Sequence, residues 1–212
     1  MTITTGFDQN CKRCKRLADF LRDSKNKFPD YHCAPVAPFG PKNIKLLIVG
    51  LAPGLHGANA TGRPFTGDFA GILLYETLHK FGYGNKTVSE SLNDGLKLKD
   101  CRITNAVKCV PPQNKPTGEE IKICNEFLHN ELAELKPGTV ILALGGIAHA
   151  SVLRAAGLKP KDGKFGHGNI HHLPNELILI DSYHCSRYNT QTRRLTEKMF
   201  HAVFEKIESL KS

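Results

Sequence analysis

The sequence predicts an α/β protein: a three-layer α/β/α sandwich whose central sheet has four mostly parallel strands. Four short runs rich in β-branched residues recur along the chain. Three of them are nearly unbroken apolar strings, as expected of parallel strands buried on both faces. Segments with helical periodicity separate these runs, and this alternation implies right-handed crossover connections. A chain of 212 residues can bury a full core, so we expect residues 1–212 to form a single domain.

The expected elements alternate along the chain, each strand as an apolar run and each helix as a segment of helical periodicity. In order they are the strand Lys45–Gly50, the helix Gly71–Phe81, the strand Arg102–Val107, the helix Thr117–Leu135, the strand Thr139–Leu144, the helix Gly145–Ala156, the strand Glu176–Asp181 and the helix Thr190–Leu210. Thr117 stands three residues before Glu120, which is the capping-box pattern that begins a helix. Because ligands of such folds bind at the carboxyl ends of the strands, we expect functional residues directly after the strands.

Charge and hydropathy limit the class of protein. The chain has 29 Lys and Arg against 20 Asp and Glu, a formal net charge of +9. This excess points to a polyanionic partner, although lysines scattered over a soluble surface also explain it. No apolar run approaches the roughly 18 residues of a membrane span, and the N-terminus does not resemble a signal peptide. We therefore expect a cytoplasmic protein, associated with the nucleoid if it is prokaryotic, in which cysteines stay reduced.

The segment after the first strand, Gly50–Gly71, is a long loop with six glycines. Loops of this length inside a compact domain are usually functional. Phe65 in this loop is either a stacking platform for an aromatic ligand or an anchor tucked into the core. Asp68 is either the N-cap of the next helix or a carboxylate at a pocket rim, and both roles are compatible. The loop lacks the Walker A and G-x-G-x-x-G patterns, which argues against nucleotide hydrolysis and nicotinamide chemistry.

Polar residues also follow the second and fourth strands. Asn105 stands near a strand end and carries two donors and an acceptor, which suits recognition of a pyrimidine edge. Asn114 lies in a proline-rich loop, where it either contacts a base or water or is an ordinary turn residue. His184 lies directly beyond the last strand, and Arg187 with its neighbouring arginines adds positive charge suited to phosphates.

Four of the seven cysteines form two pairs. Cys11 and Cys14 make a C-x-x-C motif among basic residues, whereas Cys109 and Cys124 are 15 positions apart. The choices are a structural zinc site, a [4Fe–4S] cluster or no metal at all. The second pair is far wider than in a zinc ribbon, which favours the cluster by a small margin. Core packing is the default interpretation of Cys101.

Four segments, in the correct order, closely resemble the motifs of the uracil-DNA glycosylase superfamily. They are GLAPGLHGANATGRPFTGD from Gly50, TNAVKCVPPQNKPTGEE from Thr104, KFGHG from Lys164 and SYHCSRYNTQTRRLT from Ser182. The match is nearest to family 5, the type B iron–sulfur glycosylases. The resemblance implies the three-layer fold with a four-stranded sheet. It also implies a [4Fe–4S] cluster that ties in the N-terminal segment through the ligands Cys11, Cys14, Cys109 and Cys124.

The resemblance also implies roles for the residues after the strands. Catalysis in the type B family is associated with the Asp that ends FTGD, here Asp68, and Asn114 and His184 match the other catalytic positions. Phe65 matches the aromatic residue on which the extruded base stacks. Family 4 enzymes carry a Glu where this chain has Leu51, so the pocket should tolerate more than uracil.

The remaining expected contacts concern the base and the DNA. His184 should donate to a pyrimidine carbonyl oxygen as negative charge develops there. The edge of the base should meet Asn105 and the loop residues Gly50, Leu51, Ala52, Pro53 and Gly54. The DNA should meet Ser186, Arg187 and Tyr188. The superfamily often has His-Pro-Ser where this chain has His184-Cys185-Ser186, and the loss of that proline should relax the loop.

These expectations describe a monofunctional, monomeric glycosylase of base-excision repair. Its substrate would be double- or single-stranded DNA containing uracil or another deaminated base such as hypoxanthine, flipped out of the stack. One alternative is a strictly uracil-specific, family 4-like enzyme, against which Leu51 and the His56–Asn59 insertion argue. The other is a non-catalytic module that binds damaged DNA, against which the presence of Asp68, Asn114 and His184 argues.

Overall fold

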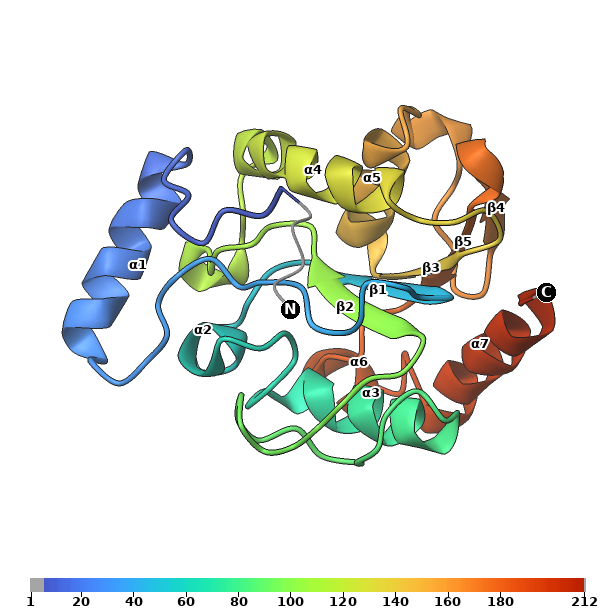
Figure 1. The fold of residues 1–212 in the computed structure, drawn as a ribbon, viewed down its shortest axis with the longest axis horizontal. Helices are drawn as coiled ribbons and strands as arrows, with labels where there is room; N and C mark the ends of the chain where they lie inside the picture. Colours follow the sequence, from blue (N-terminus) through green and yellow to red (C-terminus); the bar gives the residue numbers. More distant parts are fainter. Residues whose placement is uncertain (1–5, 212) are drawn as a thin grey trace.

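The structure of the protein is a computed structural model that describes residues 6–211. Its helices are α1 Lys15–Lys27, α2 Ala58–Thr61, α3 Phe69–Lys80, α4 Gly118–Ala133, α5 Gly146–Ala155, α6 Arg187–Gln191 and α7 Glu197–Leu210. Its strands are β1 Leu46–Gly50, β2 Cys101–Asn105, β3 Val140–Leu144, β4 Ile170–His172 and β5 Ile178–Ser182. The helices α4 and α5 cover one face of the sheet, and α3 and α7 cover the other (Figure 1). The predicted α/β/α sandwich is confirmed.

The sheet has the spatial order β2-β1-β3-β5-β4. The strands β1, β2, β3 and β5 are parallel, and each lies within two residues of its predicted position. The prediction of four strands misses β4, which pairs antiparallel with β5 at the sheet edge. This strand has only three residues, two of them histidines, and its outer residues are exposed. It therefore lacks the apolar run by which the other strands are recognised.

The prediction of one helix over Thr190–Leu210 is wrong. The chain forms α6 and α7, and Arg193 between them adopts a left-handed φ of +58°. Leu195 in the break is fully buried, so the apolar repeat continues through a segment that is not helical. The Thr196 side chain accepts a hydrogen bond from the Met199 N–H at 3.2 Å and starts α7.

Helix α1 also lies outside the predicted elements. It is amphipathic, with Leu17 and Leu21 buried and its charged residues outside. Arg16 on α1 binds both carboxylate oxygens of Glu120 on α4, at 2.8 and 2.7 Å. Within residues 6–211, no helix is long and apolar enough to cross a bilayer.

Alternate residues of the central strands supply two cores, one on each face of the sheet. Leu46 and Ile48 of β1 pack with α3 and α7, whereas Leu47 and Val49 pack with α4 and α5. This alternation is the period-two geometry of a strand covered on both sides. Cys101 is fully buried in the first of these cores, as the sequence analysis expects. The two packed layers leave the carboxyl ends of the strands free to carry a site.

Candidate active site

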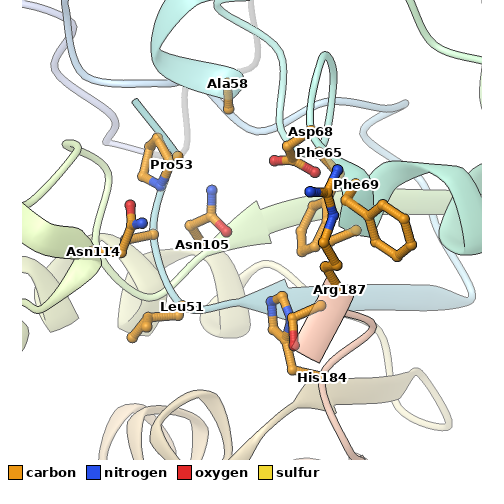
Figure 2. Close-up of a pocket in the computed structure, with 14 residues that line it drawn as sticks. Leu51, Pro53, Ala58, Phe65, Asp68, Phe69, Asn105, Asn114, His184 and Arg187 are labelled. Carbon is orange, nitrogen blue, oxygen red and sulfur yellow. The ribbon is translucent and has the colours of Figure 1, made fainter. Parts of the chain in front are cut away.

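A pocket of about 370 Å³ opens at the carboxyl ends of the parallel strands (Figure 2). Gly50 at the end of β1 pairs in register with Asn105 at the end of β2, and the chain beyond β5 runs into His184. The volume lies within the range typical of small-molecule sites. The pocket is lined by Leu51, Ala52, Pro53, Gly54, Ala58, Phe65, Asp68, Phe69, Ala70, Asn105, Asn114, His184, Ser186 and Arg187.

Most residues singled out from the sequence line this pocket together. Gly50 lies directly behind it, since a Cβ there would come 2.5 Å from Asn105 Oδ1 and 2.7 Å from the tip of the Phe65 ring. Only glycine therefore allows both side chains to pack this closely against the end of β1. Tyr188 is 70% exposed and is not part of the pocket wall.

The sequence analysis missed three wall residues, namely Ala58, Phe69 and Ala70. Phe69 and Ala70 form the first turn of α3, directly after Asp68. An aromatic residue next to the motif aspartate was the available signal for Phe69. Ala58 at the start of α2 and Ala70 in α3 carry no such signal, because small apolar side chains have no distinctive chemistry.

Phe65 is both an anchor and a pocket wall. It is 6% exposed, and its backbone has a left-handed φ of +56°, a conformation uncommon outside glycine. Its ring centroid lies 5.9 Å from that of His184, with 28° between the two ring planes. The two interpretations of Phe65 therefore hold together, because the ring is buried against the end of β1 and still lines the pocket.

Asp68 likewise combines its two expected positions. Its Oδ1 accepts a hydrogen bond from the Gly71 N–H at 3.0 Å, which makes Asp68 the N-cap of α3. Its Oδ2 faces Gly57, 2.7 Å from where a Cβ would lie, and the side chain lines the pocket. Burial raises the pKa of the Asp68 carboxyl, although the N–H groups of Gly71 and Ala70 oppose this rise. The carboxylate is therefore more basic than an ordinary aspartate.

His184 is neutral in this environment. Burial lowers its pKa to about 4, because desolvation disfavours the imidazolium. The His184 carbonyl accepts a hydrogen bond from Asn189 Nδ2 at 2.8 Å, which ties this loop to α6. Figure 2 shows the imidazole facing the pocket from below, beneath Arg187. A neutral imidazole has one N–H, which is a donor for an oxygen in the pocket.

The two asparagines occupy different depths. Asn105 is 3% exposed, and its Oδ1 is buried with no hydrogen-bond partner among the described residues. Leaving such an acceptor unpaired costs roughly 1–3 kcal/mol. A ligand that donates a hydrogen bond to this oxygen would recover that free energy. Asn114 is exposed at the pocket rim, in a short 3₁₀ turn, Pro112–Asn114, with a left-handed φ of +56°.

The residues expected to meet DNA form the first turn of α6. Ser186 is its N-cap and accepts a hydrogen bond from the Asn189 N–H at 3.4 Å. The Arg187 guanidinium lies over the Phe69 ring, 5.0 Å from its centroid, at the edge of the pocket. Cys185 is fully buried, so the residue in place of the proline packs into the core.

The four cysteines expected to bind a cluster line one cavity, beside Leu17 of α1 and Phe127 of α4. All of them are free thiols. Burial raises the pKa of Cys14 to about 11 and also raises the pKa values of Cys109 and Cys124. Four thiols from separate segments around one cavity are a donor set that fits a metal centre, which they would bind as thiolates.

The spacing of the four thiols can be compared with that of a zinc site. A tetrahedral zinc ion with Zn–S bonds of about 2.3 Å holds its sulfurs about 3.8 Å from one another. In the described part of the chain, no three of these sulfurs lie within 4.8 Å of one another. This spacing is wider than that of a tetrahedral zinc site, and four thiols around one cavity are also the donor set of a larger group such as an iron–sulfur cluster.

A buried network of ionisable groups fastens the KFGHG segment to the end of β5. His149 Nδ1 lies 2.7 Å from Asp181 Oδ1, and His149 Nε2 lies 3.0 Å from the Gly163 carbonyl oxygen. Asp181 Oδ2 accepts from the Gly166 N–H at 3.2 Å and lies 3.0 Å from His171 Nε2. Burial alone would lower the pKa of His149, but Asp181 and Gly163 hold it above its ordinary value. Because both partners of His149 are acceptors, its ring is protonated on both nitrogens.

Comparison with known proteins identifies the family. Residues 37–208 match the family model described as the Uracil DNA glycosylase superfamily. The chain belongs to the uracil-DNA glycosylase superfamily. The family expected from the sequence motifs is thereby confirmed.

Relatives narrow the position within this superfamily. A type-5 uracil-DNA glycosylase of Thermus thermophilus is 43% identical over 206 residues, which cover 94% of this chain and 93% of the relative. A type-5 enzyme of Pyrobaculum aerophilum is 39% identical, with 88% and 83% covered. A type-4 uracil-DNA glycosylase of Saccharolobus solfataricus is 28% identical, with 95% and 83% covered. These similarities favour family 5 over family 4, as the motifs do.

Proposed function

We propose that this protein is a monofunctional uracil-DNA glycosylase, which takes a uracil out of DNA and hydrolyses its N-glycosidic bond. The observation that carries this proposal is the pocket itself. It combines an unpaired buried carboxamide oxygen on Asn105, a basic carboxylate on Asp68 and a neutral imidazole on His184. No lysine lines the pocket among the described residues, so a hydrolytic reaction is favoured over one through an amine nucleophile.

Recognition of uracil follows from the unpaired amide. Asn105 Oδ1 accepts from the uracil N3–H, and its Nδ2 donates to O4, so both polar positions of one base edge are matched. The Phe65 ring stacks on the face of the flipped base. Alanine substitutions at such stacking residues typically cost about 1–3 kcal/mol per base. The loop Gly50–Gly54 closes around the base with backbone groups.

Cleavage of the glycosidic bond separates charge, and the catalytic side chains stabilise the charge on each fragment. As the C1′–N1 bond breaks, its electron pair moves to the base and the sugar becomes cationic. The His184 N–H donates to the developing oxyanion of the base, and the Asp68 carboxylate stabilises the sugar cation. Asp68 then accepts a proton from the water that adds to C1′. Asn114 at the rim orients this water.

The same pocket has room for a two-ring base. Leu51 supplies an apolar wall in place of a carboxylate, and a pocket with fewer polar groups discriminates less strongly between bases. We therefore include hypoxanthine among the substrates.

The DNA backbone is held beside the pocket mouth. Arg187 lines the edge of the pocket, the exposed Tyr188 would insert next to the vacated base, and the Ser186 hydroxyl would contact a phosphate. Affinity should fall as salt rises, because phosphate contacts release counterions. The enzyme acts as a cytoplasmic monomer on this substrate.

Cys11, Cys14, Cys109 and Cys124 would hold a [4Fe–4S] cluster. Bound there, the cluster would form a covalent cross-link. It would join the segment before α1 to α4 and to the loop that precedes α4. The cross-link would join the segment before α1 to the rest of the fold, so the chain would form one domain.

A panel of duplexes with single lesions tests the proposal. Purified protein is incubated with uracil, hypoxanthine and undamaged duplexes, and abasic sites are measured as alkali-labile strand breaks. We expect uracil to be released first, hypoxanthine more slowly and normal bases not at all. Release of uracil without any hypoxanthine would indicate the family 4-like alternative. Tight binding to the lesion without base release would indicate the non-catalytic module and refute the proposed function.

A further inference from the structure

The backbone at Phe65 is held in place from several directions. A non-glycine residue with a φ of +56° persists only where its surroundings determine it. The N-terminus of α3 packs directly against Phe65, since a Cβ on Gly71 would lie 1.9 Å from the Phe65 carbonyl oxygen. The position of the ring in the pocket therefore depends on the residues that fix this turn.

Arg63, two residues before Phe65, is a buried charged residue, only 2% exposed. Its Nη1 donates to both carboxylate oxygens of Asp94, at 2.9 and 2.8 Å, and its Nη2 donates to the Leu92 carbonyl at 2.7 Å. The guanidinium also lies 4.5 Å from the Phe39 ring centroid. Because Asp94, Leu92 and Phe39 contact the guanidinium from three directions, the main chain at Arg63 has little freedom to move.

Asp94 in turn organises an irregular segment. Its carboxylate accepts hydrogen bonds from the N–H groups of Glu90, Ser91 and Leu96, at 2.8, 3.2 and 2.8 Å. Burial alone would raise the pKa of Asp94, but these N–H groups and Arg63 hold it well below its ordinary value. The carboxylate is thus charged at all physiological pH values, and it links Arg63 to a segment about 30 residues farther along the chain.

Two further hydrogen bonds reach the neighbours of Phe65. The Tyr75 hydroxyl donates to the Pro64 carbonyl at 2.7 Å, and the Thr66 hydroxyl lies 2.6 Å from the Ser89 hydroxyl. Tyr75 and Thr66 are 1% and 0% exposed. The residues on both sides of Phe65 are therefore fastened, one to α3 and one to the segment that Asp94 organises.

We propose that Arg63 and Asp94 are positioning residues for base excision, because their ion pair fixes the turn from which Phe65 presents its ring to the base. Neither residue lines the pocket, so any effect on the reaction is indirect, and the proposal assigns it to the position of Phe65. The inference rests on the proposed function and deepens it. A merely structural ion pair would lower thermal stability in the same way, but its effect on excision would not depend on the Phe65 ring.

A double-mutant cycle between Arg63→Lys and Phe65→Leu tests this dependence. The lysine keeps the charge but loses the planar fork, and the leucine keeps much of the volume but loses the flat ring. Single-turnover excision of uracil and the midpoint of thermal unfolding are measured for both variants and their combination. We expect Phe65→Leu to slow excision about tenfold, in line with the value of one stacked base. Arg63→Lys should slow excision about fivefold alone and less than twofold beside Phe65→Leu.

The thermal midpoint should behave differently from the rate. Arg63→Lys should lower it by the same amount with either residue at position 65, because the ion pair is lost in both cases. Tyr83→Phe serves as a control, since it removes the hydrogen bond from the buried Tyr83 hydroxyl to the exposed Glu208 carboxylate, 2.7 Å long, and neither residue lines the pocket. It should lower the midpoint and leave the excision rate unchanged.

Milder variants keep the test decisive if Arg63→Lys does not fold. Tyr75→Phe removes only the hydroxyl that holds Pro64, and Asp94→Asn keeps the shape of the carboxylate. Each should show the same coupling to Phe65→Leu. Equal losses of rate in both backgrounds, or wild-type rates with lowered midpoints, would overturn the inference and leave the proposed function standing. A wild-type rate for Phe65→Leu would instead overturn the stacking role on which both depend.

Discussion

Replacing Asp68 with asparagine separates the two roles of this side chain. As N-cap, Asp68 accepts from the Gly71 N–H at 3.0 Å, and an asparagine oxygen can accept the same bond. Asp68→Asn should therefore fold as stably as the wild type, since burial already disfavours the charge that it removes. Asp68→Ala loses the cap, which costs about 1 kcal/mol. For a chain of this size that loss lowers the thermal midpoint by about 2–4 °C.

The reaction should respond to the charge and not to the cap. Removing a group that stabilises developing charge slows catalysis about 10²- to 10³-fold, and both variants lose the carboxylate. Single-turnover excision from a uracil duplex, with enzyme in excess, measures the chemical step, and circular dichroism measures the midpoint. A rate for Asp68→Asn within twofold of the wild type, at saturating enzyme, would refute the catalytic role and leave Asp68 as an N-cap only.

The pH profile supplies a second measurement of the same group. Because burial raises the pKa of Asp68, protonation removes the carboxylate at a higher pH than for an ordinary aspartate. The wild-type rate should therefore fall on the acid side at a pH above the usual range of about 4. This acid limb should be absent from the residual activity of Asp68→Asn. An identical limb in the variant would mean that another group titrates.

Three further predictions concern the imidazoles and the thiols. His184→Ala should slow excision about 100-fold and leave the pH profile unchanged near the ordinary histidine pKa of about 6.5, because His184 is already neutral there. A wild-type inflection at that pH that the variant lacks would contradict a neutral imidazole. Cys109→Ser should abolish the visible absorbance and bound iron of the purified protein, whereas Cys101→Ser, whose thiol is buried outside the cysteine cavity, should keep both; equal iron in the two variants would contradict the assigned ligand. His149→Gln should lower the thermal midpoint more at pH 6 than at pH 9. The pKa of His149 is raised in the fold, so its stabilisation is complete below the unfolded value of about 6.5 and is lost as pH rises through the folded value. A difference independent of pH would contradict the buried imidazolium.

The elements that the sequence predicts correctly are those in which the pattern of apolar residues matches the pattern of burial. The strand β3 (VILAL) is apolar at every position because both of its faces are covered, so the run alone identifies it. The edge strand β4 gains its structure from pairing with β5, and its three residues carry no pattern of their own. The break between α6 and α7 was missed for the opposite reason, since Leu195 is buried where the chain is not helical.

The site could be predicted to a similar degree, and for a related reason. The rule that ligands bind where parallel strands end predicts from sequence alone that Phe65, Asp68, Asn105 and His184 belong to one site. The pairing of Arg63 with Asp94 could not be predicted, because it joins two irregular segments that no periodic pattern brings into register. Contacts between loops depend on the path of each loop, and no local sequence pattern predicts that path.

The electrostatic state of the pocket explains why it should act on a transition state more strongly than on a bound base. A flipped uracil is neutral, and the imidazole that faces it is neutral too, so little charge interaction arises before the bond breaks. Burial makes the Asp68 carboxylate unfavourable, and in the proposed reaction a cationic sugar is the partner that would relieve this cost. The sugar is cationic only while the bond is breaking. Interactions realised only at that stage raise the rate of the chemical step, whereas those shared with the bound substrate do not. In the proposed mechanism, the burial that lowers the pKa of His184 and raises that of Asp68 would therefore contribute to catalysis through the same desolvation.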